Sequence, residues 1–203
     1  MDNPKPSMRR LVDFYDPVTK GADIVGRTLD HILSWPDSRL ESCHNYIQKL
    51  FPLPEMSGVT LSAPILDEQT VLFFRQSRQL QTSVLRTLKR MLSFYGFDAV
   101  DKGWDDYENT LLTITPKSDC QPGFSHWVKN KDHNHRRITR IIRSLRLLGL
   151  GGAATDFFNA VIAVQNQRNV ISKATIEFWT AAHSWELRYT LDGKAEILWL
   201  QGF

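Results

Sequence analysis

From about residue 134 to residue 148, aliphatic side chains recur every three or four positions, and this spacing constrains the fold more than any other feature of the chain. The stripe consists of Ile138, Ile141, Ile142, Leu145 and Leu148. Because an α-helix has about 3.6 residues per turn, the spacing places these groups on one side, facing a core. The pattern predicts an amphipathic helix with arginines on its other faces, ending at the GLGG sequence of residues 149–152.

The same periodicity predicts further helices, over about 23–34, 37–51, 67–77, 80–95, 154–167 and 172–187. Pro36 and Pro52 end two of them, since the residue before a proline is driven out of the helical region. Residues 110–115 fit either a short strand or an extended loop. The Asp192-Gly193 pair between two β-prone runs is compatible with a small C-terminal hairpin. We therefore expect a mostly α, single-domain bundle of about six or seven helices.

The N-terminal region has a different character, because Pro4, Pro6 and Pro17 oppose helix formation. Residues 1–20 are therefore predicted to form an extended N-terminal arm, and residues 21–203 a helical domain. A chain of 203 residues with 42% hydrophobic and 23% charged residues has ordinary globular composition and enough material for a substantial core.

Charge and targeting signals indicate the compartment. The net charge of +3 argues only weakly for a polyanionic partner. Two widely spaced cysteines, Cys43 and Cys120, do not form a disulfide framework and indicate free thiols in a reducing compartment. The N-terminus lacks the apolar region of a signal peptide, and no run is long enough to span a bilayer. We expect a soluble cytoplasmic or nuclear protein without a membrane span, and its oligomeric state stays open.

Polar residues of the stretch HNYIQKLFPLPE (44–55) stand next to a corner made by Pro52 and Pro54. His44 and Gln48 are four residues apart and share a helix face, so they could bind a ligand or tie down the corner. The free N–H groups at the start of the arginine-flanked helix attract carboxylate or phosphate. Two distant segments are expected to enclose one cavity, lined by His44, Tyr46, Gln48, His133, Asn134, Arg137 and Arg140.

Several of these blocks together resemble a known family. HNYIQKLFPLPE resembles the H-x-Y-I-Q-x-L-F-P-L signature of the opioid growth factor receptor conserved domain. MLSFYG (91–96), HNHRRITRIIRSLRLLGL (133–150) and the acid-aromatic sequence at 156–158 resemble further blocks in the same order. The resemblance covers roughly residues 25–190, and it implies a soluble helical domain. In animal members it implies binding of an enkephalin-type peptide, nuclear location, and acidic and repeat-rich extensions.

The first hypothesis is therefore a ligand-binding domain that takes a small peptide or an anionic small molecule, without a cofactor. The alternative is a stand-alone biosynthetic enzyme, cyclase-like or otherwise, using acid–base catalysis in an aromatic-rich helical pocket. The sequence names no catalytic residues for it. A second alternative is an RNA- or DNA-binding adaptor that uses the arginine-rich helix.

Two weaker patterns bear on metals. His126, His133 and His135 are close in sequence, but the basic residues around them repel a cation, so no metal site is expected. The acidic stretch at 105–108 is faintly similar to the paired acids of terpene cyclases. Its spacing differs from theirs, and a solvated acidic loop is the better interpretation.

Overall fold

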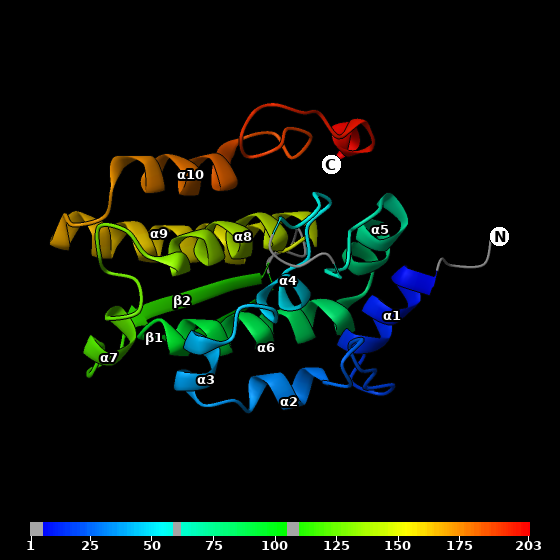
Figure 1. Ribbon diagram of the computed structural model, residues 1–203, viewed down its shortest axis with the longest axis horizontal. Helices are drawn as coiled ribbons and strands as arrows, with labels where there is room; N and C mark the ends of the chain where they lie inside the picture. Colours follow the sequence, from blue (N-terminus) through cyan, green and yellow to red (C-terminus); the bar gives the residue numbers. More distant parts are fainter. Residues whose placement is uncertain (1–5, 59–61, 105–109) are drawn as a thin grey trace. The chain divides into compact units, whose positions relative to one another are not determined.

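The computed structural model describes residues 6–58, 62–104 and 110–203 of the chain (Figure 1). The chain divides into two compact units, Met1–Thr87 and Leu88–Phe203, and the boundary falls within one helix. Of ten α-helices in the described residues, six have seven or more residues. The prediction of a mostly α fold with about six or seven substantial helices is confirmed. The domain boundary predicted after residue 20 stays a prediction.

The first unit consists of short helices. They are α1 (Pro6–Tyr15), α2 (Leu29–Leu33), α3 (Asp37–Ser42), α4 (Ile47–Leu50), α5 (Glu68–Gln76) and the start of α6 (Arg78–Phe94). Side-chain oxygens cap several of them, for example α2 and α5. Thr28 accepts a hydrogen bond from the His31 amide at the start of α2, and Asp67 accepts one from the Thr70 amide at the start of α5. Such caps satisfy amide groups that have no partner within the helix.

The prediction of an extended N-terminal arm is wrong for residues 6–15, which form α1. Pro6 is the first residue of this helix, where proline is tolerated because its missing N–H would have no partner inside the helix. Leu11, Phe14 and Tyr15 are buried on one side of α1. Tyr15 packs edge-to-face on Phe74 of α5, with the ring centroids 5.4 Å apart. Pro17 lies beyond the end of the helix, so no proline interrupts α1, and burial of this aromatic face stabilises it.

The helix predicted from residue 37 to the corner at Pro52 is interrupted. It ends at Ser42, and Cys43 is extended, with φ of −89° and ψ of 132°. Next to this break, Asn45 Oδ1 accepts hydrogen bonds from the side chains of Arg27 at 2.9 Å and Cys43 at 3.3 Å. Asparagine also has a low helix propensity, so it favours an interruption here.

The second unit begins with the end of α6 and a two-stranded antiparallel sheet. β1 (Phe97–Trp104) pairs with β2 (Thr110–Pro116), with Phe97 opposite Pro116 and an irregularity between Asp101 and Gly103. Residues 110–115 are thus a strand, one of the two conformations predicted for them. The amide of Leu112 donates a 2.7 Å hydrogen bond to the Asp156 carboxylate, which attaches β2 to a neighbouring helix.

Three longer helices pack on one another in the second unit, and β2 lies along one of them (Figure 1). They are α8 (His133–Leu147), α9 (Gly151–Arg168) and α10 (Lys173–Ser184); the short α7 (Gln121–Phe124) comes before them. All the aliphatic residues of the predicted α8 stripe are fully buried. Trp127 and Trp179 are also fully buried, with ring centroids 6.0 Å apart.

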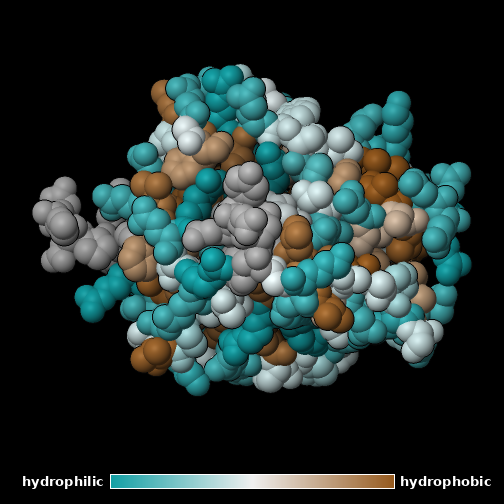
Figure 2. Space-filling model, turned by 180° about the vertical axis from the view of Figure 1, so that it is seen from behind, coloured by the Kyte–Doolittle hydropathy of each residue, from teal (hydrophilic) through white to brown (hydrophobic). Residues whose placement is uncertain are grey.

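The C-terminal segment turns at Asp192-Gly193 but forms little sheet. Tyr189 and Glu196 make one isolated antiparallel bridge, and a 3-10 helix follows at Leu198–Gly202. The predicted hairpin is thus reduced to a turn with a single bridge. No helix in the described ranges is both long enough and apolar enough to cross a bilayer. The face shown in Figure 2 is mostly hydrophilic, with hydrophobic residues in scattered small groups.

Candidate functional site

The first unit carries three of the predicted ligand-binding residues on one short segment. His44 is exposed just before α4, whereas Tyr46 and Gln48 are buried. Tyr46 packs edge-to-face on Trp35, with the ring centroids 5.7 Å apart. The fold therefore brings Tyr46 and Gln48 into the interior of the unit and leaves His44 at its surface.

Arg27 fixes the start of this segment from a neighbouring loop. Its guanidinium pairs with Asp23 at 2.7 Å and donates from Nη1 to Asn45 Oδ1 at 2.9 Å. The guanidinium carbon also lies 5.5 Å from the ring centroid of Trp35, within cation–π range. Charged hydrogen bonds and an aromatic contact thus hold the buried segment in one geometry.

The side-chain carbonyl of Gln48 is buried without a compensating hydrogen bond. The residue is 6% exposed, and its Oε1 atom has no hydrogen-bond partner among the described residues. Gln165 is a direct comparison, because it is 5% exposed and its Oε1 accepts a 3.0 Å hydrogen bond from the Ile171 amide. A buried polar atom without a partner costs about 1–3 kcal/mol. Gln48 Oε1 is therefore an unsatisfied acceptor at a position that is closed to solvent.

Lys49, the next residue, is a buried charged group that the sequence did not single out. It is 7% exposed, and its Nζ atom lies 3.5 Å from the Ser62 carbonyl oxygen. Burial lowers the pKa of the Lys49 ammonium. The negative charge of Asp23 raises this pKa, and the positive charge of Arg27 lowers it further. A lysine at the end of a short helix normally faces solvent, so no local signal indicated this burial.

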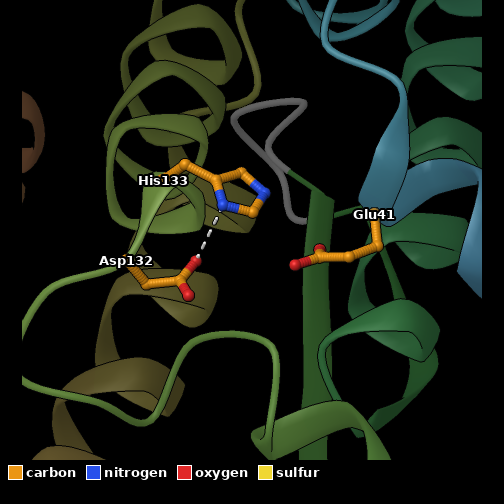
Figure 3. Close-up of side chains that lie close together, drawn as sticks. All are labelled: Glu41, Asp132 and His133. Carbon is orange, nitrogen blue, oxygen red and sulfur yellow. Dashed lines mark ion pairs between the residues drawn. The ribbon is translucent and has the colours of Figure 1, made fainter.

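In the second unit, Asp132 organises the start of α8. Its Oδ1 atom accepts a 2.8 Å hydrogen bond from the Asn134 amide and lies 3.4 Å from His133 Nδ1 (Figure 3). Aspartate is a preferred N-cap residue, because its carboxylate accepts from the free amide groups of the first turn. An acid directly before the HNHRR sequence was the available signal for this role. Asp132 positions two of the predicted site residues.

The structure also brings Asn134 and Arg137 together. The fully buried Asn134 donates from Nδ2 to the His126 carbonyl oxygen at 2.9 Å and accepts from Arg137 Nη1 at 3.1 Å. His133 stays exposed, and Arg140 is half-buried one turn further along the helix. It stays a prediction that Arg137 and Arg140 together bind an anion. It also stays a prediction that all seven residues line one cavity.

Two of the histidines weighed as metal ligands have partners of their own. His126 stacks on Phe94, with ring centroids 4.4 Å apart. His135 Nε2 lies 2.7 Å from the Trp127 carbonyl oxygen, and burial lowers the pKa of His135 despite that contact. Both rings therefore serve packing and hydrogen bonding within the unit. The acidic stretch at 105–108 lies outside the described residues.

Two cations of the basic helix hold main-chain carbonyls of the second unit. Arg143 is fully buried and donates from Nη2 to the Leu187 carbonyl oxygen at 3.1 Å. Arg146 donates to the carbonyl oxygens of Ala182 at 2.8 Å and Trp185 at 2.9 Å. Charged donors on orphan carbonyls near a helix end are stabilising, so these two arginines have a structural role.

Comparison with known proteins identifies several relatives. The chain is 32% identical to the rat opioid growth factor receptor over 163 residues, which is 77% of this chain and 27% of the rat protein. It is 37% identical to the human opioid growth factor receptor over 123 residues, covering 60% of this chain and 17% of the human protein. The opioid growth factor receptor-like protein 1 of Xenopus tropicalis is 33% identical over 111 residues, 55% of this chain and 20% of the relative. The chain thus spans about a quarter or less of the length of these relatives.

No solved structure matches the fold of the chain. A family model described as the opioid growth factor receptor (OGFr) conserved region matches residues 23–189, close to the range over which the sequence blocks indicated the resemblance. That match covers most of the chain and includes all seven predicted ligand-binding residues. The chain belongs to the OGFr conserved-region family.

Proposed function

We propose that the chain is a ligand-binding domain of the OGFr type and that its ligand is a short peptide. The relatives are named as receptors for an opioid growth factor, and the family resemblance implies an enkephalin-type peptide. The proposal rests on one structural observation: the buried carbonyl oxygen of Gln48 has no hydrogen-bond partner in the part of the chain that the structure describes.

The chemistry of a peptide suits this oxygen. Every residue of a peptide except proline carries an N–H donor, and the terminal ammonium adds a charged one. A donor that reaches Gln48 Oε1 replaces an unsatisfied acceptor with a hydrogen bond, so binding recovers a cost that the free protein bears. Exposed His44 lies four residues before it, at the surface end of the same segment.

The proposal gives the predicted residues roles within each unit. In the first unit, His44 is exposed and can contact a ligand directly, whereas Tyr46 is fully buried. In the second unit, His133 is exposed and Arg140 is half-buried, and the fully buried Asn134 positions Arg137 by accepting its hydrogen bond.

Calorimetric titration of the full chain with an enkephalin-type peptide tests the proposal. Gln48→Met keeps the length of the side chain and removes the oxygen, so we expect affinity to fall at least about tenfold, equivalent to about 1.4 kcal/mol. Gln165→Met is the matched control, because its oxygen is already paired within the fold, and it should bind as the wild type does. An unchanged affinity of Gln48→Met, or no heat of binding in the wild type, contradicts the proposal.

Nucleic-acid binding has less support. Arg137 and Arg143 are buried, and Arg146 donates hydrogen bonds to main-chain carbonyls. These three arginines are therefore poorly available to the phosphates of a nucleic acid. In the first turn of α8, Arg136 is exposed. Few accessible cations give a shallow dependence of affinity on salt.

A further inference from the structure

A small surface pocket lies entirely within the first unit, and Gln48 is not among the residues that line it. It lies where the end of α1 and the following loop meet α2 and the first half of α6, and its volume is about 120 Å³. Phe14, Tyr15 and Leu29 form an apolar floor, and all three are buried. A cavity of about 150 Å³ holds a benzene ring. This pocket is therefore the right size for a branched aliphatic group of four carbons.

A group of three charged residues at the pocket carries a net positive charge. Asp30 is shared by two cations, Arg86 at 2.6 Å and Lys20 at 3.6 Å, and all three line the pocket. Two cations on one carboxylate leave a surplus of one positive charge. All three side chains are between 47% and 62% exposed, so the surplus is available to an incoming carboxylate.

The lining of the pocket also includes a carboxylate without a cation. Asp16 accepts hydrogen bonds from the Val18 amide, the Thr19 hydroxyl and the Gln79 side-chain amide, at 2.9, 2.8 and 3.1 Å. These donors are neutral, and in the part of the chain that the structure describes no Lys or Arg pairs with Asp16. The hydrogen bond from Val18, followed by that from Thr19, lowers the pKa of Asp16, which is therefore ionised at neutral pH.

Lys20 is held over the pocket by an uncommon backbone conformation. Its φ of +49° lies in the left-handed region, which costs a non-glycine residue about 1–2 kcal/mol. Its amide donates a 2.9 Å hydrogen bond to the Asp16 carbonyl oxygen, so the loop fixes both charges together. Residues kept in such conformations cluster at ligand sites.

We propose that this pocket binds a free α-amino acid with a compact aliphatic side chain. The side chain fills the apolar floor, the ammonium pairs with Asp16, and the carboxylate pairs with Lys20 and Arg86. One apolar group flanked by opposite charges is the chemistry of a zwitterionic amino acid. A peptide N-terminus shares the ammonium and the side chain but lacks the adjacent carboxylate.

Titration of the full chain, followed by NMR chemical shifts and calorimetry, separates these features. L-Leucine should bind saturably. Three probes should each bind at least about tenfold more weakly: 3-methylbutylamine lacks the carboxylate, 4-methylpentanoate lacks the ammonium, and glycine lacks the side chain. Leu-Gly-Gly reports on a peptide N-terminus. Absence of leucine binding, or binding of the amine or of Leu-Gly-Gly as tight as that of leucine, overturns the proposal.

Two variants and a control place the binding in this pocket. Asp16→Asn should weaken leucine binding at least about tenfold. Asp192→Asn is its control, because Asp192 is an exposed aspartate in a turn and likewise accepts hydrogen bonds, from the Thr190 hydroxyl and the Lys194 amide. Lys20→Gly relieves the backbone strain, so it should raise the melting temperature while weakening leucine binding. Wild-type leucine affinity in both Asp16→Asn and Lys20→Gly overturns the proposal.

Discussion

Arg146 donates a hydrogen bond from Nη2 to the carbonyl oxygen of Trp185, at 2.9 Å. Trp185 is the C-cap residue of α10, and Arg146 lies in the last turn of α8. The last carbonyls of a helix have no partner within the helix. A side chain of α8 therefore closes the end of α10, and the guanidinium reaches the Ala182 carbonyl oxygen as well.

Replacing Arg146 by glutamine should destabilise the protein by about 1–3 kcal/mol, because two charge-assisted hydrogen bonds are lost and carbonyl groups lose their donor. Urea denaturation measures the free energy of unfolding. Arg136→Gln is the control, since Arg136 is exposed on the same helix, and it should change stability by no more than about 0.5 kcal/mol. Equal effects of the two substitutions would show that the contacts of Arg146 contribute nothing.

Gly123 should not tolerate a side chain. A Cβ atom at this position would lie 2.2 Å from the amide nitrogen of Gly96, which has a φ of +88° at the end of α6. Gly123→Ala forces two backbones apart, so a loss of several kcal/mol is expected, visible as a lower melting temperature. Gly151→Ala is the matched control, because no atom lies within 4 Å of the added carbon. It should leave the melting temperature unchanged or raise it. A melting temperature of Gly123→Ala equal to that of Gly151→Ala contradicts the close approach.

Stability should fall as the pH is lowered from about 7 towards 5. Burial lowers the pKa of His135 in the folded protein below the value of about 6.5 expected in the unfolded chain. Protons therefore bind the unfolded state more readily, and the stabilisation present above pH 6.5 is lost as the pH falls through the folded pKa. His183, whose pKa is lowered by burial and then by Arg146, acts in the same direction.

Urea denaturation at pH 7.5 and pH 5.5 measures this dependence. His135→Gln should reduce the difference in unfolding free energy between the two pH values, with part of it remaining because of His183. An identical pH dependence in wild type and variant would mean that His135 is not protected from protonation in the folded state.

The elements with regular spacing could be predicted because one face of each is buried. The α8 stripe is the clearest case, since each aliphatic residue that defined the helix is in the core. α1 was missed because three prolines outweighed a short aromatic face in the sequence, whereas burial of Phe14 and Tyr15 decides the fold. The break at Cys43 was missed because the apolar spacing continues through it, and the contact of Asn45 with Arg27, 18 residues away, exists only in the folded unit.

The candidate site was harder to predict, because pairing of polar groups is a property of the folded unit. Gln48 and Gln165 look alike in the sequence, but one oxygen is unpaired and the other is bound by the Ile171 amide. The pocket beside Asp16 was hidden by the wrong prediction for α1, since its floor is formed by the end of that helix.

The free energy of unfolding of Gln48→Met and Gln165→Met, measured with and without an enkephalin-type peptide, tests the central proposal most directly. Without peptide, Gln48→Met should equal the wild type or exceed it by up to about 2 kcal/mol, because an unsatisfied buried acceptor is removed. Gln165→Met should lose about 1–3 kcal/mol, because the Ile171 amide loses its partner. Saturating peptide should stabilise the wild type and Gln165→Met by about 1.4 kcal/mol more than Gln48→Met, because the affinity of that variant is expected to be about tenfold lower. A Gln48→Met protein that is destabilised without peptide and stabilised by it as much as the wild type would contradict a ligand-binding role for this oxygen.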